Sequence, residues 1–527
     1  MKILINANIY TLNPHQPHAE AIVIDKNRVI TVGKTDDILR EFNMPSSVED
    51  LQGKTILPGL TDAHIHLEYY ALALQKIDCE TRTRAECLAK VAARATETPK
   101  GEWILGHGWN QNEWPKGFGD AELLDTVAPD HPVYLTAKSL HAGWANTLAL
   151  KRGNVTADTP DPKDGALQRR EDGSPTGILF ETAMQLVSHV VPATTQAQSE
   201  AAIRDAQPVL WAMGVTGVHD FDGRRCFISL QNLQQRGELG LRVIKSIPLS
   251  DLDDAIGVGL RTGFGNDYLR IGNVKAFADG ALGPHTAAMF APYEDDPSNT
   301  GILMLEREEI IEHGQKAAQN GLGMVIHAIG DRANHEVIEA YTHLRTFEAK
   351  HALPHYRHRI EHVQLLHPND FGKLAAQQII ASMQPVHATS DITAANAFWG
   401  NRSKYAYAWR SLLDMGTAMA FGSDAPVDSP NPFWGLHAAL TRRRGDGSPG
   451  QDGWYPEQRI TRLEALQGYT TGAAFAAGME TRLGQLAPGY LADLIILDAD
   501  YFRVDAMTVR DLLPSRTMVD GSWVFSA

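Results

Sequence analysis

Residues 307–331 have the sequence REEIIEHGQKAAQNGLGMVIHAIGD, a helix-like stretch followed by an apolar run that ends in polar residues. The same order, in which an apolar strand-like run gives way to ionisable side chains, recurs through the middle of the chain. Strands that alternate with helices are typical of parallel βα units. The pattern therefore predicts an α/β fold with a parallel sheet.

Several apolar runs are candidates for the strands of this sheet. They are TILPGLTDAHIH (55–66), HPVYLTAK (131–138), GVTGVHDF (214–221), LRIGNVKAFADG (269–280), GLGMVIHAIGD (321–331), HRIEHVQLL (358–366), IIASMQP (379–385) and TAMAFGSDAP (417–426). His327 and His362 are 35 residues apart, and Gln384 and Asp424 are 40 apart. These intervals are near the roughly 30 residues per unit of an eight-unit barrel of about 250 residues with insertions. We therefore expect a (β/α)8 TIM barrel.

The two ends of the chain have a different pattern. Both contain short runs that alternate between apolar and polar residues and are separated by turn signals, among them Asp520-Gly521. Period-two alternation with such turns is typical of antiparallel strands. We expect a small β-sandwich domain built from both termini, residues 1–57 and 480–527.

The barrel would then occupy residues 58–479, with one region that does not fit. From about residue 70 to 208 the chain is too long for one or two βα units, and it is rich in turn residues, as in GWNQNEWPKGFGD (108–120). We expect this segment to be an inserted subdomain packed over the barrel mouth.

Composition excludes several classes of protein. Of the 527 residues 43% are hydrophobic, and acidic residues outnumber basic ones by 63 to 48, for a formal net charge of −15. This balance argues against disorder and against a nucleic-acid or membrane-surface binder, which needs a basic surface. The chain has no long apolar run, no recognisable signal peptide and only three cysteines, without zinc or disulfide spacing. We expect a cytoplasmic protein that acts on a small molecule, and its length and acidity are compatible with a homodimer.

The first candidate site lies in DAHIH (62–66). Side chains two residues apart on a strand point to the same face, so the imidazoles of His64 and His66 can reach one metal ion. The pair ends an apolar run, which is where a barrel carries its chemistry. The alternative is two ordinary polar residues at the end of a strand.

Further candidates end later strand-like runs. Lys275 follows apolar residues, and a buried ammonium is costly, so this side chain extends to solvent, loses its proton or is carboxylated by CO₂ into an oxygen ligand. His327 and His362 close two successive runs whose ends face the same mouth, although a lone histidine there can also be a core residue. Glu361 and Asp331 are polar neighbours that can hold such ligands by hydrogen bonds.

Asp424, in MAFGSDAPV (419–427), completes the set. A carboxylate at this point can bind a metal and take a proton from bound water, or it can cap the next helix. The ordered set is then His-x-His, Lys, His, His and Asp. Histidine and carboxylate ligands in this number suit Zn²⁺, with Mn²⁺ and Fe²⁺ as alternatives.

These motifs resemble those of the amidohydrolase superfamily, whose strand-one signature is similar to PGLTDAHIHL (58–67). Along its whole length the chain resembles one branch of this superfamily, the N-substituted formamide deformylase-like hydrolases (the amidohydrolase 3 family). The motifs are GWNQNEWP (108–115), HAGWANTLAL (141–150), GVTGVHDF (214–221), VKAFADGALG (274–283), VIHAIGDRA (325–333), RIEHVQ (359–364), QPVHATSD (384–391), GSDAPV (422–427) and LGQLAPGYLADLIILD (483–498).

The resemblance implies a barrel with a β-sandwich from both termini and hydrolysis of a non-peptide C–N bond, in an amide or N-substituted formamide, by a metal-activated water. The implied metal ligands are His64, His66, Lys275, His327, His362 and Asp424. Asp424 would also be the general base, and carboxylated Lys275 would bridge two metals. The alternative is one metal beside an unmodified Lys275.

Substrate contacts are expected from residues near the mouth and in the insertion. The candidates are Trp109, Trp114, His141, His219, Asp222 and His387. Tryptophans of the insertion can line an apolar pocket, or they can simply pack the insertion.

Three other functions are alternatives to this one. A deaminase of the same superfamily typically carries a glutamate three residues after the strand-five histidine, where this chain has Gly330, with Asp331 one position further. A lactone or carbamate hydrolase would use the same metal site. A non-catalytic metal-binding protein would have lost a ligand or the base, whereas every expected position is filled here.

Overall fold

The computed structural model describes residues 1–527 except 43, 45–46, 112–113, 139–140 and 164, so part of the GWNQNEWP motif lies outside the described residues. The chain forms two compact units, Met1–Tyr70 with Ile203–Ala527 (unit 1), and Ala71–Ala202 (unit 2). The chain passes between them within helices α2 (Leu67–Leu74) and α7 (Gln196–Ala212). None of the helices in the described part of the chain has the length and apolar character of a membrane span.

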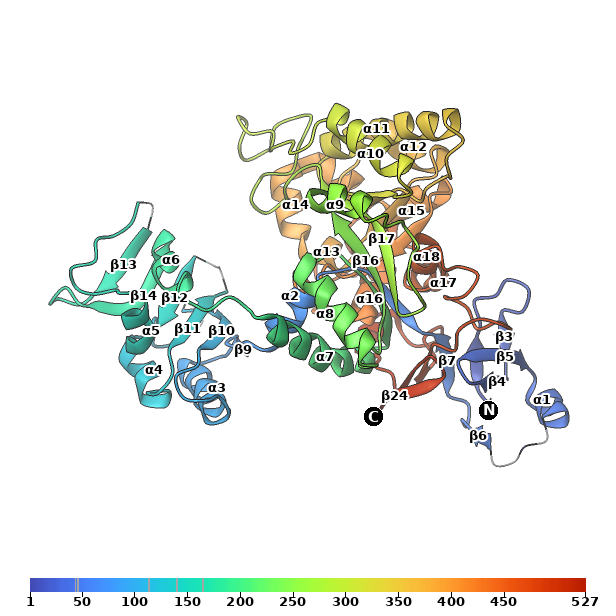
Figure 1. Ribbon diagram of the computed structural model, residues 1–527, viewed down its shortest axis with the longest axis horizontal. Helices are drawn as coiled ribbons and strands as arrows, with labels where there is room; N and C mark the ends of the chain where they lie inside the picture. Colours follow the sequence, from blue (N-terminus) through green and yellow to red (C-terminus); the bar gives the residue numbers. More distant parts are fainter. Residues whose placement is uncertain (43, 45–46, 112–113, 139–140, 164) are drawn as a thin grey trace. The chain divides into compact units, whose positions relative to one another are not determined.

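Unit 1 contains an eight-stranded, all-parallel sheet in the order β21-β20-β19-β18-β17-β16-β15-β8. Figure 1 shows its neighbouring strands β16 and β17. Its strands are β8 (Leu60–Ile65), β15 (Val215–Asp220), β16 (Arg242–Pro248), β17 (Leu269–Phe277), β18 (Met324–Ala328), β19 (Arg359–His362), β20 (Ile380–Met383) and β21 (Met419–Phe421). A parallel bridge between Ile65 and Ala425 connects the end of β8 to the segment after β21. The sheet is thus nearly closed, which confirms the predicted TIM barrel.

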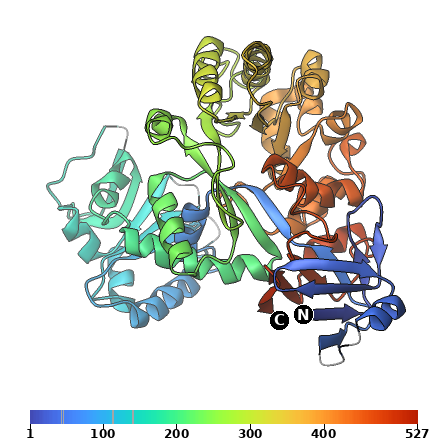
Figure 2. The ribbon, with the colours of Figure 1, turned by 45° about the vertical axis from the view of Figure 1, so that its right-hand side comes forward.

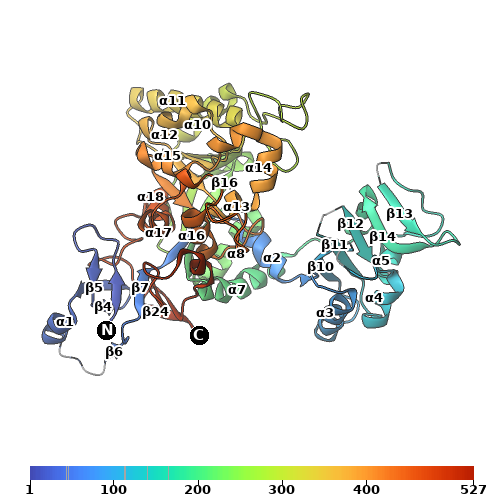
Figure 3. The ribbon, with the colours of Figure 1, turned by 180° about the vertical axis from the view of Figure 1, so that it is seen from behind.

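Helices follow the barrel strands along the chain, and α10 and α11 lie side by side (Figures 1 and 3). α10 begins where the sequence predicts, because Glu306 and Glu309 form a capping box around its first turn. The helices after α7 are α8 (Arg224–Gln235), α9 (Leu252–Gly257), α10 (Arg307–Gln319), α11 (Asp331–Lys350), α12 (Phe371–Ala376), α13 (Pro385–Ser390), α14 (Ile392–Trp399), α15 (Trp409–Asp414), α16 (Pro432–Thr441), α17 (Arg462–Gly468) and α18 (Thr471–Ala476).

Two expectations about the barrel strands were wrong. HPVYLTAK forms β11 (Val133–Ala137), which belongs to the sheet of unit 2, where it pairs in parallel with β10 (Ile104–Trp109) and so has the same local pattern as a barrel strand. The barrel strand β16 was missed because Lys245 and Ser246 interrupt its apolar run. Lys245 is nevertheless buried. Its charge is balanced by Asp220, whose Oδ2 lies 3.0 Å from the Nζ of Lys245.

Strands from both termini form two further sheets in unit 1, as expected, and Figure 2 shows the blue and red strands together. One sheet contains β1 (Lys2–Ile5), β4 (Ala21–Asp25), β5 (Arg28–Gly33) and β6 (Val48–Asp50), and the other β2 (Asn8–Tyr10), β3 (His18–Ala19), β7 (Thr55–Pro58), β22 (Leu494–Leu497), β23 (Arg516–Val519) and β24 (Ser522–Ser526). The short helix α1 (Thr35–Glu41) follows β5. A buried ion pair ties these strands to the barrel, since Nη2 of Arg242 lies 2.8 Å from Oδ1 of Asp493.

Unit 2 is a six-stranded mixed sheet with its own apolar core. Besides β10 and β11 it contains β9 (Ile77–Asp78), β12 (Ala142–Ala145), β13 (Gly165–Arg169), β14 (Pro175–Glu181), α3 (Arg84–Glu97), α4 (Ala121–Val127), α5 (Thr147–Arg152) and α6 (Gln185–Ser188). The domain boundaries drawn from the sequence, and the position of the insertion over the mouth, stay predictions.

Candidate metal centre

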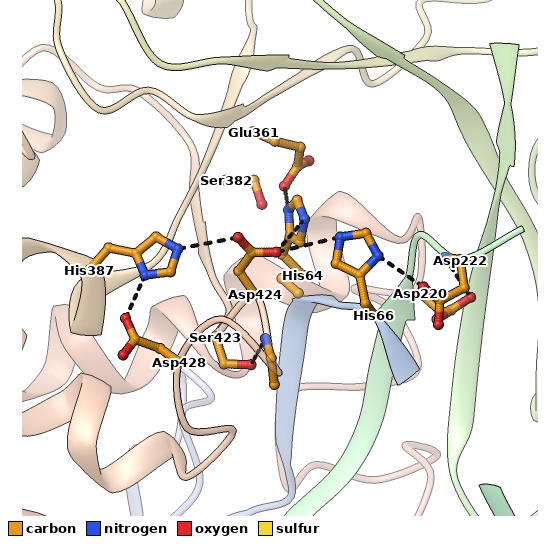
Figure 4. A network of polar contacts seen from close by, with 12 residues as sticks. His64, His66, Asp220, Asp222, Glu361, Ser382, His387, Ser423, Asp424 and Asp428 are labelled. Atoms are coloured by element: carbon orange, nitrogen blue, oxygen red, sulfur yellow. Dashed lines mark hydrogen bonds and ion pairs between the residues drawn. The ribbon is translucent and has the colours of Figure 1, made fainter. Parts of the chain in front are cut away.

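Three imidazoles face the carboxylate of Asp424 (Figure 4). The Nε2 atoms of His64 and His66 lie 3.4 Å and 3.5 Å from its Oδ1. Nε2 of His387 lies 3.3 Å from its Oδ2. His64 and His66 project from the end of β8, as the two-residue spacing predicts, and Asp424 follows β21.

Each of these three histidines is held at its other nitrogen by a second carboxylate. Nδ1 of His64 is 2.6 Å from Oε2 of Glu361, and Nδ1 of His66 is 2.9 Å from Oδ1 of Asp222. Nδ1 of His387 is 2.7 Å from Oδ2 of Asp428. A proton on Nδ1 of His64 and His66 leaves each Nε2 with a free lone pair, which is the arrangement that metal-binding histidines use.

The close approach of two backbone segments sets this geometry. The N–H of Asp424 donates to the carbonyl of His64 at 2.7 Å, and Asp62 accepts from the N–H of Ser423 at 2.9 Å. A Cβ on Gly422 would lie 2.4 Å from the backbone nitrogen of His64, so only glycine fits there. Asp424 itself has a left-handed backbone with φ of 59°, a conformation that costs free energy and is common at functional sites.

His327, His362 and Lys275 lie beside this group. The ring centroid of His362 lies 4.5 Å from that of His327 and 4.9 Å from that of His64. Nε2 of His327 lies 2.8 Å from the carbonyl of Gly280, so a proton there leaves Nδ1 free. Lys275 comes from β17, and its ammonium lies 4.7 Å from the ring centroid of Phe221.

Burial sets the charge state of the site. It lowers the pKa of His64 to about 4 and that of Lys275 to about 8, and together with the charge of Lys275 it lowers the pKa of His327 to about 3. Burial raises the pKa of Asp424, but the neighbouring His64 and His387 outweigh it and hold that pKa well below its usual range. Neutral imidazoles and an ionised carboxylate are the forms that bind a metal.

His387, like His66, differs from the other histidines of the site in having a raised pKa. Burial lowers its pKa, but hydrogen bonds and charge interactions with Asp424 and Asp428 outweigh this and raise the pKa to about 10. His387 was predicted to contact substrate. Both of its ring nitrogens are directed at carboxylates here, which favours a role in holding Asp424, and a substrate contact stays a prediction.

The donor set fits a divalent metal such as zinc. Donor atoms of His64, His66 and Asp424 all lie within 4.8 Å of one another. Two buried nitrogens, Nζ of Lys275 and Nδ1 of His362, have no hydrogen-bond partner among the described residues. Because buried polar atoms are normally paired, these two indicate a missing ligand.

Two other predicted substrate contacts in unit 1 are buried. Asp222 holds His66 and also accepts from the N–H of Glu68 at 2.6 Å, at the start of α2. Nδ1 of His219 accepts from Nη1 of Arg359 at 2.8 Å inside the barrel. These contacts favour supporting roles, so substrate binding by Asp222 and His219 stays a prediction.

The remaining predicted substrate contacts belong to unit 2. Trp109 and Trp114 are buried in its core, where their rings stack with centroids 6.0 Å apart, and they also pack on Trp144. His141 is exposed, and its Nδ1 is 3.0 Å from Oε2 of Glu181. The tryptophans thus stabilise unit 2, and their assignment to a substrate pocket stays a prediction.

Sequence reasoning missed Asp428, Arg359 and the role of Asp62. Asp428 lies four residues after Asp424, a spacing that could have drawn attention to it. Arg359 begins β19 and no local signal distinguishes it from an ordinary surface arginine, although it is almost fully buried.

A family model described as "Amidohydrolase family" matches residues 47–525. The chain belongs to the amidohydrolase family. Protein LONG AFTER FAR-RED 3 of Arabidopsis thaliana is 32% identical over 94% of this chain and 87% of its own length. The N-substituted formamide deformylase of Arthrobacter pascens is 26% identical over 98% of this chain and 97% of its own length. These matches confirm the resemblance found in the sequence.

Solved structures of similar fold include a metal-dependent hydrolase. A crystal structure of an uncharacterized metal-dependent hydrolase from Pyrococcus furiosus superposes with a TM-score of 0.78 at 29% identity, covering 95% of this chain and all of that one. Family and structural match together support the broad class of a metal-dependent hydrolase.

The carboxylates behind the histidines provide a direct test. We expect Asp222→Asn to weaken zinc binding by about 10- to 100-fold, because the amide is a weaker acceptor for Nδ1–H of His66. Zinc affinity would be measured by competition with a chromophoric chelator.

Glu348→Gln is the matched control for this test. Glu348 is a buried carboxylate that also holds a histidine, with Oε1 2.8 Å from Nε2 of His358, but it lies outside the Asp424 group. Its zinc affinity should equal that of the wild type. Equal affinity in the Asp222→Asn variant would show that His66 is not a ligand.

Proposed function

We propose that this protein is a metal-dependent hydrolase that cleaves a non-peptide C–N bond, in an amide or an N-substituted formamide. The observation that supports this most strongly is the ionised Asp424 carboxylate, which lies within 3.5 Å of the free nitrogens of two histidines whose other nitrogens are held by carboxylates. The similarity to a formamide deformylase along nearly the whole chain supports the choice of bond.

His64, His66, His327, His362 and Asp424 would hold the metal, which we propose to be Zn²⁺. When bound, a metal supplies Lewis acidity that brings the pKa of water from about 15.7 toward about 7. Lys275 would add an oxygen ligand between two such ions once it is carboxylated. Burial supports this modification, because a pKa of about 8 leaves part of the amine unprotonated and able to add to CO₂.

Asp424 would carry the proton through the reaction. It accepts a proton from water as the water oxygen adds to the carbonyl carbon, and it returns that proton to the nitrogen as the C–N bond breaks. The products are a carboxylate, formate in the case of a formamide, and an amine. The pKa of Asp424, held low by His64 and His387, keeps it ionised before the step.

The structure gives no support to the deaminase alternative. That reaction needs an acid beside the strand-five histidine, and Gly330 stands at the expected position. Oδ1 of Asp331 accepts from the backbone N–H of Phe290 at 3.0 Å, and Asp331 begins α11. The carboxylate is thus engaged in the loop rather than placed among the histidines.

We also propose that the protein is cytoplasmic and forms a homodimer.

Replacement of the base separates catalysis from metal binding. We expect Asp424→Asn to lower kcat on an amide or formamide substrate by about 10²- to 10⁴-fold, the usual contribution of a general base. The histidines should still retain metal. The measurement is turnover on a panel of amides and N-substituted formamides, with metal content determined on the same samples; turnover near that of the wild type would exclude Asp424 as the base.

Replacement of Lys275 tests the bridge. We expect Lys275→Ala to lower metal content from about two ions per chain to about one or fewer, because the bridging oxygen ligand is lost. Lys275→Arg is the companion variant, since it keeps a cation that cannot be carboxylated, and it should lose metal equally. An unchanged metal content in both variants would leave the site without a lysine bridge.

A further inference from the structure

A polar cavity lies at the opposite end of the barrel strands from the metal centre. It has a volume of about 270 Å³ and is lined by side chains that include Ser246, Arg270, Asn273, Arg357 and Arg359. Arg270 and Arg359 stand at the starts of β17 and β19, whereas the candidate ligands Lys275 and His362 stand near the ends of the same strands. The cavity is therefore separate from the candidate active site.

The charges around this cavity have one sign. Three arginines and His355 line it, and none of its described lining residues is acidic, in a chain whose formal net charge is −15. Arg357 is paired with Glu480, with Nη1 2.7 Å from Oε2. Arg359 is paired with Glu361, with Nη2 2.9 Å from Oε1.

Arg270 has no such partner. Among the described residues, its guanidinium has no hydrogen bond and no ion pair closer than 4.0 Å. Asp267 acts on Arg270 electrostatically, but Oδ2 of Asp267 is already 2.5 Å from Nη2 of Arg482. The guanidinium of Arg270 thus brings to the cavity a positive charge that no hydrogen-bonded carboxylate among the described residues neutralises.

Two donors at this cavity are buried without an acceptor. They are the Nε atoms of Arg270 and Arg359, neither of which has a partner among the residues that the structure describes. Arg359 is only 3% exposed, and its Nη atoms donate to His219, Ser382 and the carbonyl of Ala63. A buried unpaired N–H is costly, and a charged one more so, which indicates an acceptor that the protein itself does not supply.

We propose that this cavity binds a small oxyanion, such as a carboxylate or inorganic phosphate, between Arg270 and Arg359. Guanidinium groups are well suited to this ligand because their planar N–H donors match the oxygens of carboxylate and phosphate. The volume is several times the roughly 30 Å³ of one water molecule in the liquid, yet below that of most sites for drug-sized ligands, so the ligand is small.

Arg359 connects the two sites. It contacts Oε1 of Glu361, and Oε2 of the same carboxylate is 2.6 Å from Nδ1 of His64 (Figure 4). An anion at Nε of Arg359 competes with Glu361 for the same guanidinium charge. Binding at the cavity therefore acts on a candidate metal ligand through two side chains, and by thermodynamic reciprocity metal binding acts on the anion.

Isothermal titration calorimetry of the metal-free, full-length protein tests the proposal, with sodium phosphate and sodium acetate as separate probes. We expect one anion per chain in the wild type, and the tighter of the two probes identifies the class of oxyanion. Arg270→Gln should weaken binding by about 10-fold or more, because it removes a charge-assisted contact. Arg270→Lys keeps the charge and should retain most of the affinity.

Arg40→Gln is the control, since it removes the same charge from an exposed helix of the terminal β domain. It should bind like the wild type. No binding of either probe, or equal binding by Arg270→Gln, would overturn the proposal, the second result because the anion would then be held elsewhere, for example by the cations of the metal centre.

A second measurement does not depend on the folding of any variant. Wild-type crystals soaked in selenate should show an anomalous difference peak within hydrogen-bond distance of Arg270 and Arg359. A cavity without such a peak in crystals that carry selenate elsewhere would contradict the assignment.

Discussion

The structure depends on one arrangement, a buried carboxylate at Asp424 that is faced by the nitrogens of three histidines, each held from behind by another carboxylate. Five barrel strands or the segments after them must end at the same point to build it, namely β8, β15, β19, β20 and β21. Several carboxylates lie close together in a buried region, and such a group is stable only when cations balance it. Lys245, Arg359 and His387 provide three of these cations, and a divalent metal among the histidines would add further positive charge.

Much of this could be predicted from the sequence, because the decisive signals are local. The spacing of His64 and His66 on one strand, and the position of His327, His362 and Asp424 at the ends of apolar runs, place these side chains at one mouth by strand geometry alone. The alternating pattern at both termini likewise indicates their β strands.

The rest could not be predicted because it depends on contacts between distant segments. Asp222 and His66 are 156 residues apart, and Glu361 and His64 are 297 apart, so no spacing rule connects either pair. Lys245 conceals β16, since a buried lysine resembles a surface residue until its partner Asp220 is known. Trp109 and Trp114 are equally ambiguous, because an aromatic side chain suits a core as well as a pocket. Specificity in this architecture lies in loops and insertions, where sequence patterns carry the least information.

Elemental analysis of protein purified without chelator, with His64→Ala as the comparison, tests whether the Asp424 group is a metal centre. We expect about two zinc-like ions per wild-type chain and a clear loss in the variant, because His64 presents its free Nε2 to the site. A wild-type protein that takes up no metal even after reconstitution with Zn²⁺, or a variant that retains the full amount, would contradict the assignment of a metal centre.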